Sequence, residues 1–268
     1  MLKITSLQNP KIKQVVKLRD KRERDHTQSF LIEGYRELSR AVKGGVPLVS
    51  LFCSPDHFLG SNENALIQEI QGGGVEAFEV NKGVFEKISY RDRPDGLLAV
   101  ASQTHLALKD LDYKLTNERP PFFLVAEAIE KPGNLGSILR SCDAAGVDAL
   151  LVCDRCTDIY NPNVVRASVG TLFTVPVLEV SSEEAIEWLK NHQITIVATS
   201  PDAKETFTKV DLTGPVAIAM GTEQLGLSEK WMKAADLQVS IPMNGIADSL
   251  NVAAATTLLL YEVLRQRS

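Results

Sequence analysis

The sequence predicts an α/β protein in two parts, with a parallel sheet in the second part. Short apolar runs alternate with amphipathic stretches along the 268 residues, the pattern of strands alternating with helices. In the second half, runs such as Val216–Met220 are apolar throughout rather than alternating, so both faces of those strands are expected to lie beneath helices. A chain of this length suits one large domain or two smaller ones.

Residues 1–104 are expected to form the smaller α/β domain. Residues 105–121 lack clear periodicity and end in two prolines, so we predict a linker there. Three glycines at 72–74 are expected to end a helix. The expected helices are Pro10–Arg24, Gly34–Lys43, Asn64–Gln71 and Asn81–Ser89, and the expected strands are Phe30–Ile32, Val49–Cys53, Val75–Val80 and Gly96–Ser102.

Residues 122–268 alternate more regularly and form the second expected domain. In parallel sheets of this kind, ligands bind beyond the C-terminal ends of the strands. The expected strands are Phe122–Ala128, Ala149–Cys153, Phe173–Val177, Ile194–Thr199, Val216–Met220 and Gln238–Ile241. The expected helices are Asn134–Ala145, Glu183–Asn191, Ser228–Ala234 and Ser249–Arg265, the last capped by Asp248 or Ser249.

The composition excludes several classes of protein. No apolar run is long enough for a membrane span, and the N-terminus lacks the pattern of a signal peptide, so we expect a cytoplasmic protein. The four cysteines show no disulfide framework. The Cys153–Cys156 pair has no second pair and no pair of histidines nearby, so we predict no metal site.

The N-terminal segment is basic although the whole chain carries a net charge of −5. Residues 1–43 hold eleven Lys and Arg against five Asp and Glu, which leaves +6 there and −11 in the remainder. Two interpretations stay open from charge alone: a polyanionic partner held at this end, or a solvated amphipathic helix.

Three loops at predicted strand ends carry unusual residues. The first, after Phe122–Ala128, reads Lys-Pro-Gly-Asn-Leu-Gly-Ser-Ile-Leu-Arg, with Asn134 at the expected helix N-cap and Arg140 on the helix. The second follows Val216–Met220 and includes Glu223. The third runs from Ile241 to Val252 and packs a Pro, a Gly and several polar side chains around a helix start. Each loop taken alone also fits a capped helix or a solvated connection.

Standard nucleotide-binding and hydrolytic motifs are absent from the sequence. The turn after the first strand of the second domain is not GxGxxG, and no P-loop, HExxH motif or Ser-His-Asp set occurs. The four histidines lie outside the three loops, so acid–base chemistry by histidine is not favoured.

Together, the three loops resemble the three motifs of the SpoU, or TrmH, family of RNA ribose 2′-O-methyltransferases, within the SPOUT superfamily. The resemblance rests on Asn134–Arg140, Met220–Ser228 and Ile241–Val252, in the family's order and spacing. The N-terminal half, with Ser6–Lys13 and Phe30–Gly34, resembles the substrate-binding domain of members that act on ribosomal RNA. The resemblance implies a SPOUT domain with a deep trefoil knot, an S-adenosyl-L-methionine cofactor and a homodimer.

The resemblance also implies roles for individual residues in transfer of a methyl group to a ribose 2′-hydroxyl, without a metal. The catalytic candidates are Arg140, Asn134, Glu223, Ser249 and Asn251, with Arg140 orienting the target ribose and phosphate. The cofactor-binding candidates are Thr199, Met220, Gly221, Ile241, Met243 and Leu250. The RNA-binding candidates on the basic N-terminal helix are Lys11, Lys13, Lys17, Arg19 and Arg22.

The expected substrate is large-subunit (23S) ribosomal RNA. The alternatives are a transfer-RNA methyltransferase, a non-catalytic RNA-binding or ribosome-assembly factor on the same fold, and a generic α/β nucleotide-binding enzyme. The methylated nucleotide, the choice between ribosome maturation and antibiotic resistance, and the subunit that supplies Arg140 to a given site all stay open.

Overall fold

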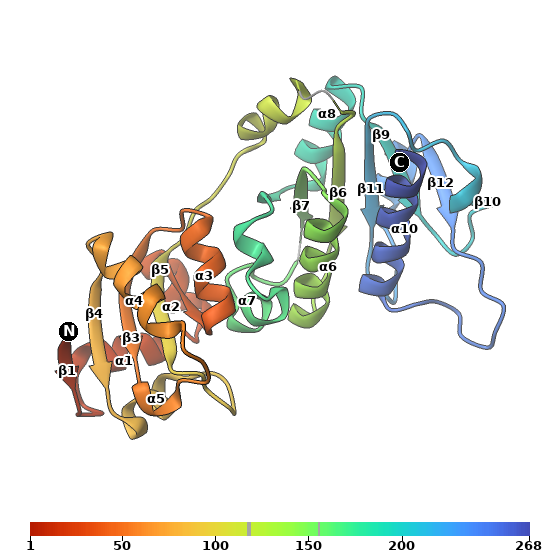
Figure 1. Cartoon of the computed structure of the whole chain (residues 1–268). Helices are drawn as coiled ribbons and strands as arrows, with labels where there is room; N and C mark the ends of the chain where they lie inside the picture. The colour runs from red at the N-terminus through yellow and green to blue at the C-terminus, as the bar shows by residue number, and fades with distance from the viewer. Residues whose placement is uncertain (117–118, 155) are drawn as a thin grey trace. The chain divides into compact units, whose positions relative to one another are not determined.

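A computed structural model describes residues 1–116, 119–154 and 156–268, coloured along the chain in Figure 1. The chain divides into two compact units. The first unit comprises Met1–Thr104 and Asp158–Thr174, and the second comprises His105–Thr157 and Val175–Ser268. The chain therefore contributes two separate segments to the first unit. The sequence does not predict that the second of them, Asp158–Thr174, packs with the N-terminal part.

The first unit is built on a mixed five-stranded sheet in the order β1-β4-β3-β5-β2. Strands β1, β3 and β4 pair in parallel, and β5 pairs antiparallel with β3 and with β2. The strands are β1 (Leu2–Ile4), β2 (Ser29–Glu33), β3 (Leu48–Cys53), β4 (Glu76–Val80) and β5 (Leu97–Ser102). The helices are α1 (Pro10–Lys17), α2 (Lys21–Thr27), α3 (Tyr35–Lys43), α4 (Glu63–Gly72), α5 (Lys82–Ile88) and α7 (Pro162–Ser168), with 3-10 turns η1 (Pro55–His57) and η3 (Thr171–Phe173).

The single helix expected over Pro10–Arg24 is wrong, because the chain breaks between α1 and α2. Leu18 caps the end of α1, and the Asp20 carboxylate accepts a hydrogen bond from the Arg22 amide (2.8 Å) to start α2. An Asp at an N-cap stabilises a new helix start. The apolar spacing belongs to α1, which buries Ile12 and Val15, whereas α2 is polar throughout and buries only Arg24.

The second unit contains a seven-stranded sheet in which every pairing is parallel, in the order β10-β12-β9-β11-β6-β7-β8. This confirms the parallel sheet expected in the second half. The strands are β6 (Phe122–Glu127), β7 (Ala149–Cys153), β8 (Val177–Val180), β9 (Thr195–Thr199), β10 (Glu205–Thr206), β11 (Val216–Met220) and β12 (Leu237–Ser240). The helices are α6 (Pro132–Ala145), α8 (Ser182–Asn191), α9 (Glu229–Ala234) and α10 (Val252–Gln266), with 3-10 helices η2 (Leu108–Thr116) and η4 (Phe207–Lys209).

Two expectations about the connections are wrong. The strand expected at Phe173–Val177 begins only at Val177, because Phe173 ends a 3-10 turn and its ring packs 5.9 Å from the ring of Phe30 in the first unit. Residues 105–121 include 117 and 118, which lie outside the described residues. The described part forms η2, and its fully buried Leu111 joins the core of the second unit, so this stretch is not a bare linker.

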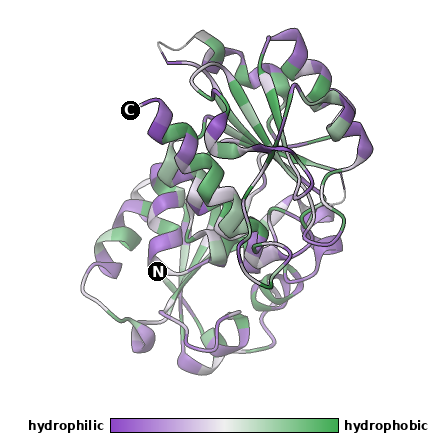
Figure 2. Ribbon diagram, turned by 90° about the vertical axis from the view of Figure 1, so that its right-hand side faces the viewer, coloured by the Kyte–Doolittle hydropathy of each residue, from purple (hydrophilic) through white to green (hydrophobic). Residues whose placement is uncertain are grey.

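The cores lie between the sheets and their helices, and Figure 2 shows hydrophobic residues concentrated on the strands and on the helix faces turned toward them. In the second unit, α10 packs beside α6 and against β11, although β12, which precedes it, lies toward the sheet edge (Figure 1). The last helix therefore returns to the centre of the sheet. Within the described residues, no helix is long and apolar enough to cross a membrane.

Candidate active site

The three motif loops meet at one edge of the parallel sheet. Because β6, β9, β11 and β12 all run in the same direction, their C-terminal ends lie on the same side. The loops that leave β6, β11 and β12 are the three loops that the sequence singled out. The fold thus brings together segments that are about one hundred residues apart in the chain.

A cavity of about 440 Å³ lies at this edge. Its wall combines backbone and apolar side chains with a few polar groups. All six cofactor-binding candidates line it: Thr199, Met220, Gly221, Ile241, Met243 and Leu250. Two catalytic candidates, Glu223 and Ser249, line it as well. A volume of this size is typical of sites for small molecules and cofactors.

Glu223 is the centre of a hydrogen-bond network that joins the three loops. Its Oε1 accepts from Asn134 Nδ2 (2.8 Å) and from Asn251 Nδ2 (2.8 Å), and Asn251 Nδ2 also lies 3.1 Å from Asn134 Oδ1. Its Oε2 accepts from Lys131 Nζ (2.6 Å). The hydrogen bond from Lys131, supported by that from Asn134, lowers the pKa of Glu223 from its ordinary value against the opposing effect of burial.

Two of these residues occupy other helix positions than the sequence suggests. Asn134 is not the N-cap of α6, because Lys131 takes that position and Pro132 fixes the first helical turn. The amide of Asn134 is therefore free to bind Glu223. The N-cap of α10 is Asn251, not Asp248 or Ser249: its Oδ1 accepts from the Ala253 amide (3.1 Å) while its Nδ2 serves the network.

The β11 loop holds Glu223 in place by closing on itself. The backbones of Thr222 and Gly226 exchange two hydrogen bonds of 3.0 Å, and the Thr222 hydroxyl accepts from the Leu225 amide. At the base of the loop, a Cβ on Gly221 would lie 2.2 Å from the Gly226 carbonyl and 2.3 Å from the Leu227 nitrogen. Only glycine permits this approach of backbone to backbone.

The far end of that loop is fixed to β6. Glu127, the buried last residue of β6, accepts a hydrogen bond from the Ser228 amide (2.8 Å). Ser228 is the N-cap of α9, but its own side chain makes no capping hydrogen bond. The Glu127 carboxylate accepts from a backbone amide at this helix start instead.

A second hollow of about 140 Å³ lies against the same loop. It shares the segment 222–225 and Val252 with the larger cavity, and its other walls include Lys131 and Asn134. Ala128 at its rim has a left-handed backbone (φ 56°), which is uncommon for a residue with a side chain and marks stored strain. Glu223 thus stands in the wall between two hollows.

Arg140 and Ser249 are not part of the network. Among the described residues, Arg140 has no hydrogen-bond or ion-pair partner, and it is exposed on α6. Six residues separate it from Asn134, which places it on a different face of the helix, about 240° around the axis. Ser249 lines the larger cavity without a hydrogen bond to Glu223, Asn134 or Asn251.

Sequence reasoning missed Lys131 as a partner of Glu223. The residue directly precedes the Pro-Gly turn of the first loop, and this position next to a motif is the signal that marks it. It missed equally that Thr222 and Gly226 close the second loop.

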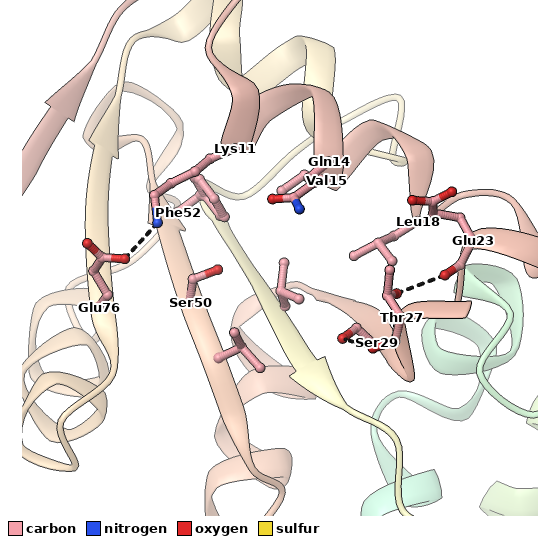
Figure 3. A pocket seen from close by; sticks show the side chains of 12 residues that line it. Lys11, Gln14, Val15, Leu18, Glu23, Thr27, Ser29, Ser50, Phe52 and Glu76 are labelled. Atoms are coloured by element: carbon pink, nitrogen blue, oxygen red, sulfur yellow. Dashed lines mark hydrogen bonds and ion pairs between the residues drawn. The ribbon is translucent and has the colours of Figure 1, made fainter. Parts of the chain in front are cut away.

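The RNA-binding candidates of the first unit lie in different surroundings. Lys13, Lys17 and Arg22 are exposed. Lys11 points across a hollow of about 200 Å³ between α1 and the sheet and pairs with Glu76 (2.8 Å), as Figure 3 shows. Arg19 donates to the carbonyls of Lys87 (2.9 Å) and Ser89 (2.6 Å), so its guanidinium ties the end of α1 to α5.

The four cysteines are free thiols, of which Cys53, Cys142 and Cys153 are buried and Cys156 is half-buried. Burial raises the pKa of Cys156 to about 12, and its sulfur accepts from the Ile129 amide (3.1 Å). Residue 155, inside the Cys153–Cys156 pair, lies outside the described residues. Across the described part of the chain, no group of three or more His, Cys, Asp or Glu side chains is placed to hold a metal ion.

Comparison with known proteins identifies the family of this chain. The model of the SpoU rRNA Methylase family matches residues 121–261, and that of the MRM3-like substrate binding domain matches residues 9–99. A 23S rRNA (uridine-2′-O)-methyltransferase from Streptomyces viridochromogenes is 31% identical over 257 residues, covering 93% of this chain and 87% of the relative.

Two solved structures are similar over nearly the whole length. An RNA 2′-O ribose methyltransferase is 41% identical with a TM-score of 0.81, covering 99% of both chains. An S-adenosylmethionine-bound rRNA methyltransferase from Sinorhizobium meliloti is 30% identical with a TM-score of 0.88, covering 98% of this chain and 97% of that one. From the three loops, their shared edge and these matches, the chain belongs to the SpoU rRNA methylase family of S-adenosylmethionine-dependent RNA 2′-O-ribose methyltransferases.

Proposed function

We propose that this protein transfers a methyl group from S-adenosyl-L-methionine to a ribose 2′-hydroxyl of large-subunit (23S) ribosomal RNA. The observation that carries the proposal is the Glu223 network, which joins all three motif loops between two hollows. The ribosomal substrate is supported by the relative from Streptomyces viridochromogenes and by the match to a substrate-binding domain. A transfer-RNA substrate is the alternative that this second match disfavours.

The larger cavity fits the cofactor. Its wall of backbone and of apolar side chains such as Met220 and Ile241 suits a flat adenine, and its 440 Å³ is in the range of cofactor sites. Thr199, Met220, Gly221, Ile241, Met243 and Leu250 are the proposed cofactor-binding residues. When bound, the cofactor supplies an electrophilic sulfonium methyl group whose leaving group is a neutral thioether, so the reaction as proposed needs no metal.

The protein's own contribution is to position the acceptor ribose and handle its proton. The reacting edge is held rigid by Asn134, Glu223 and Asn251. Ser249 lines the cavity and adds a hydroxyl to the polar part of its wall. Arg140 orients the target ribose and phosphate, since its guanidinium has no partner among the described residues and suits an oxyanion bidentately. A guanidinium is a weak base, so orientation is the primary role.

Replacing Arg140 tests the assignment. Arg140→Ala is expected to lower methyl transfer to ribosomal RNA by at least about 100-fold, while calorimetric binding of S-adenosylmethionine and the unfolding curve stay as in the wild type. Arg140→Lys, which keeps the charge and loses the planar fork, is expected to recover part of the rate. Wild-type transfer by Arg140→Ala with unchanged folding removes Arg140 from the mechanism.

We further propose that the active form is a homodimer in which Arg140 serves the partner's site. Two features support this: Arg140 faces away from Asn134 on its own helix, and α10 exposes Leu258, Tyr261 and Leu264 at helical spacing beside α6. Mixing Arg140→Ala subunits with Glu223→Ala subunits tests it, because one wild-type site forms in the mixed dimer only if Arg140 acts across the interface. No recovered activity contradicts the shared site.

The basic N-terminal segment is proposed to bind RNA phosphates through Lys11, Lys13, Lys17, Arg19 and Arg22. Replacing Lys11, Lys13 and Lys17 by Gln is expected to reduce the slope of log affinity against log salt by about 2, at about 0.7 per lost phosphate contact. Lys11 contributes least, because Glu76 already neutralises it. An unchanged slope excludes α1 from the RNA footprint.

The architecture proposed for this function is an RNA-binding domain over residues 1–104, a connection over 105–121 and a SPOUT domain over 122–268 with a trefoil knot. The return of α10 from β12 to the middle of the sheet supports the knot. The packing of Asp158–Thr174 in the first unit modifies the domain division, since this segment joins the RNA-binding part. The proposal includes a cytoplasmic location, where ribosomes are present.

A further inference from the structure

The first unit contains a second large cavity, of about 540 Å³, that none of the assignments above uses. Its walls come from the first turn of α3, the loop 59–63, the loop 91–95 and α7. We name it the α3 pocket. It exists only because the distant segment Asp158–Thr174 packs in this unit, since that segment supplies Arg166 and Val169.

The back of the α3 pocket is a fixed ion-pair cluster. Arg91 pairs with Glu37 (2.5 Å) and lies 3.6 Å from Asp95, and it donates to the Glu33 carbonyl (2.7 Å). Asp95 in turn accepts from the Tyr35 amide (3.0 Å) at the start of α3. The single charge of Arg91 thus faces two carboxylates, and these contacts fix the side chains at the back of the pocket.

The rim of the α3 pocket presents two arginines whose charges are not used inside the chain. Arg36 on α3 and Arg166 on α7 are exposed, and neither has a hydrogen-bond or ion-pair partner among the described residues. Two guanidinium groups from segments 130 residues apart thus converge on one hollow. Arginine at such a position is typical of sites that bind phosphate oxygens.

The back wall also contains two polar atoms without a hydrogen-bond partner. Arg91 Nε and Asp95 Oδ1 are buried and have no partner in the described structure. Buried polar atoms are nearly always satisfied in folded proteins, and unpaired ones call for an explanation.

We propose that the α3 pocket binds one unstacked nucleotide of single-stranded RNA, with Arg36 and Arg166 on its phosphates and Tyr35 against its base. The volume suits a nucleotide, and a concave pocket excludes a duplex, whose bases are stacked and covered. Tyr35 is half-buried at the pocket wall and offers an aromatic surface of the kind on which proteins stack splayed bases. This inference rests on the proposed function and adds a second point of contact with the substrate.

The test compares a single strand with a duplex. The probes are a fluorescein-labelled ten-nucleotide oligouridine and a ten-base-pair RNA duplex, measured by fluorescence anisotropy on the full chain. The double variant Arg36→Ala/Arg166→Ala is expected to bind the single strand at least about 10-fold more weakly, with the slope of log affinity against log salt reduced by about 1.4. Binding of the duplex is expected to change less than about 3-fold.

Matched variants keep the outcome interpretable. Arg93→Ala removes an exposed arginine of the same loop 91–95 that is not among the residues lining the pocket, and is expected to leave the preference for single strand unchanged. Arg36→Lys/Arg166→Lys keeps the charge and is expected to restore most of the salt slope. Equal losses for the two probes, or no loss for the single strand, overturn the proposal.

The result is separable from the proposed function. Methylation of ribosomal RNA by the wild-type protein tests the function, whereas oligouridine binding tests the pocket without catalysis. If the wild type methylates ribosomal RNA and the double variant binds oligouridine normally, the pocket proposal alone fails. If adenosine monophosphate displaces oligouridine and binds as tightly as oligouridine does, the pocket is a site for free nucleotides and the proposal of an RNA contact is overturned.

Discussion

The segment Asp158–Thr174 is attached to the first unit by a buried ion pair whose loss has a measurable cost. Arg24 on α2 is almost fully buried, with about 1% of its surface exposed, and its Nε and Nη2 both donate to the Asp158 carboxylate. Its Nη1 donates to the carbonyls of Leu18 (2.9 Å) and Arg19 (2.8 Å). The perturbation is Asp158→Ala, which leaves the arginine charge buried with half of its hydrogen bonds.

The structure sets the expected magnitude. Removing one partner of a buried pair costs about 3–5 kcal/mol, because the other charge stays desolvated. The two carbonyl contacts of Arg24 remain, which favours the low end, about 3 kcal/mol. Asp158 Oδ1 also accepts from the Tyr160 amide (2.9 Å), and losing this bond adds about 1 kcal/mol. The expected total is about 4 kcal/mol.

Hydrogen exchange measured by mass spectrometry assays this effect in the first unit by itself. A loss of about 4 kcal/mol corresponds to about a thousandfold drop in protection of the β2 and β5 amides, at about 1.4 kcal/mol per factor of ten. Both tryptophans, Trp188 and Trp231, lie in the second unit, so their fluorescence follows that unit separately.

Two variants frame the outcome. Asp25→Ala removes the partner of an exposed i,i+4 pair with Lys21 on the same α2 helix and is expected to cost only about 0.5 kcal/mol. Arg24→Met in addition to Asp158→Ala removes the orphaned charge, so the double variant is expected to be more stable than Asp158→Ala alone. If Asp158→Ala costs no more than Asp25→Ala, the reasoning from burial is refuted.

Three further predictions concern the candidate active site. Gly221→Ala is expected to abolish calorimetric binding of S-adenosylmethionine, because its Cβ meets the backbone of Gly226. The control Gly214→Ala, whose Cβ meets nothing within 4 Å, is expected to leave binding intact. Normal binding by Gly221→Ala contradicts the close approach. Because the pKa of Glu223 is lowered from 4.5, its network stabilises the loops fully above that pH and is lost as the pH falls through the lower folded value. Cofactor affinity should therefore be flat from pH 8 to pH 5 and fall below pH 4.5. A fall near pH 6 would count against this carboxylate. Asn251→Ser keeps an oxygen to cap α10 but removes the amide that donates to Glu223, so the free energy of unfolding should change by no more than about 1 kcal/mol while methyl transfer drops; a loss of stability without a loss of methyl transfer would show that Asn251 acts only as a cap.

The sequence predicts the second unit well, because its signals are local. Strands such as β7 and β11 are apolar runs bounded by turn residues, and their bounds agree with the structure. The break between α1 and α2 was not predictable from periodicity, because α2 has no apolar side chains whose spacing could show a change of face. The placement of Asp158–Thr174 was not predictable either, since its partners, such as Arg24, are more than one hundred residues away and no local pattern encodes them.

The candidate site shows the same division between local and distant information. Motif spacing identifies Asn134, Glu223 and Asn251, and the structure brings them within hydrogen-bond distance of one another. The same spacing does not say which of them caps a helix, because a Pro at position 132 moves the cap back to Lys131. It also says nothing of where Arg140 points, since that depends on the rotation of α6 against α10.

The two hollows of the second unit correspond to the proposed positions of the cofactor and the acceptor. Their common wall is the closed loop 222–226 with Val252, and Glu223 is fixed in that wall from both sides by Lys131, Asn134 and Asn251. In the proposed reaction, the methyl group passes from a cofactor in the larger hollow to an acceptor in the smaller one, beside Glu223. Among the described residues, the side chains that bind Glu223 there include no free cation to orient a phosphate, and Arg140 lies on another face of α6. In the homodimer that we propose, a second copy supplies Arg140 to this site, so the proposed reaction and the proposed dimer are tested together by the mixed-subunit experiment.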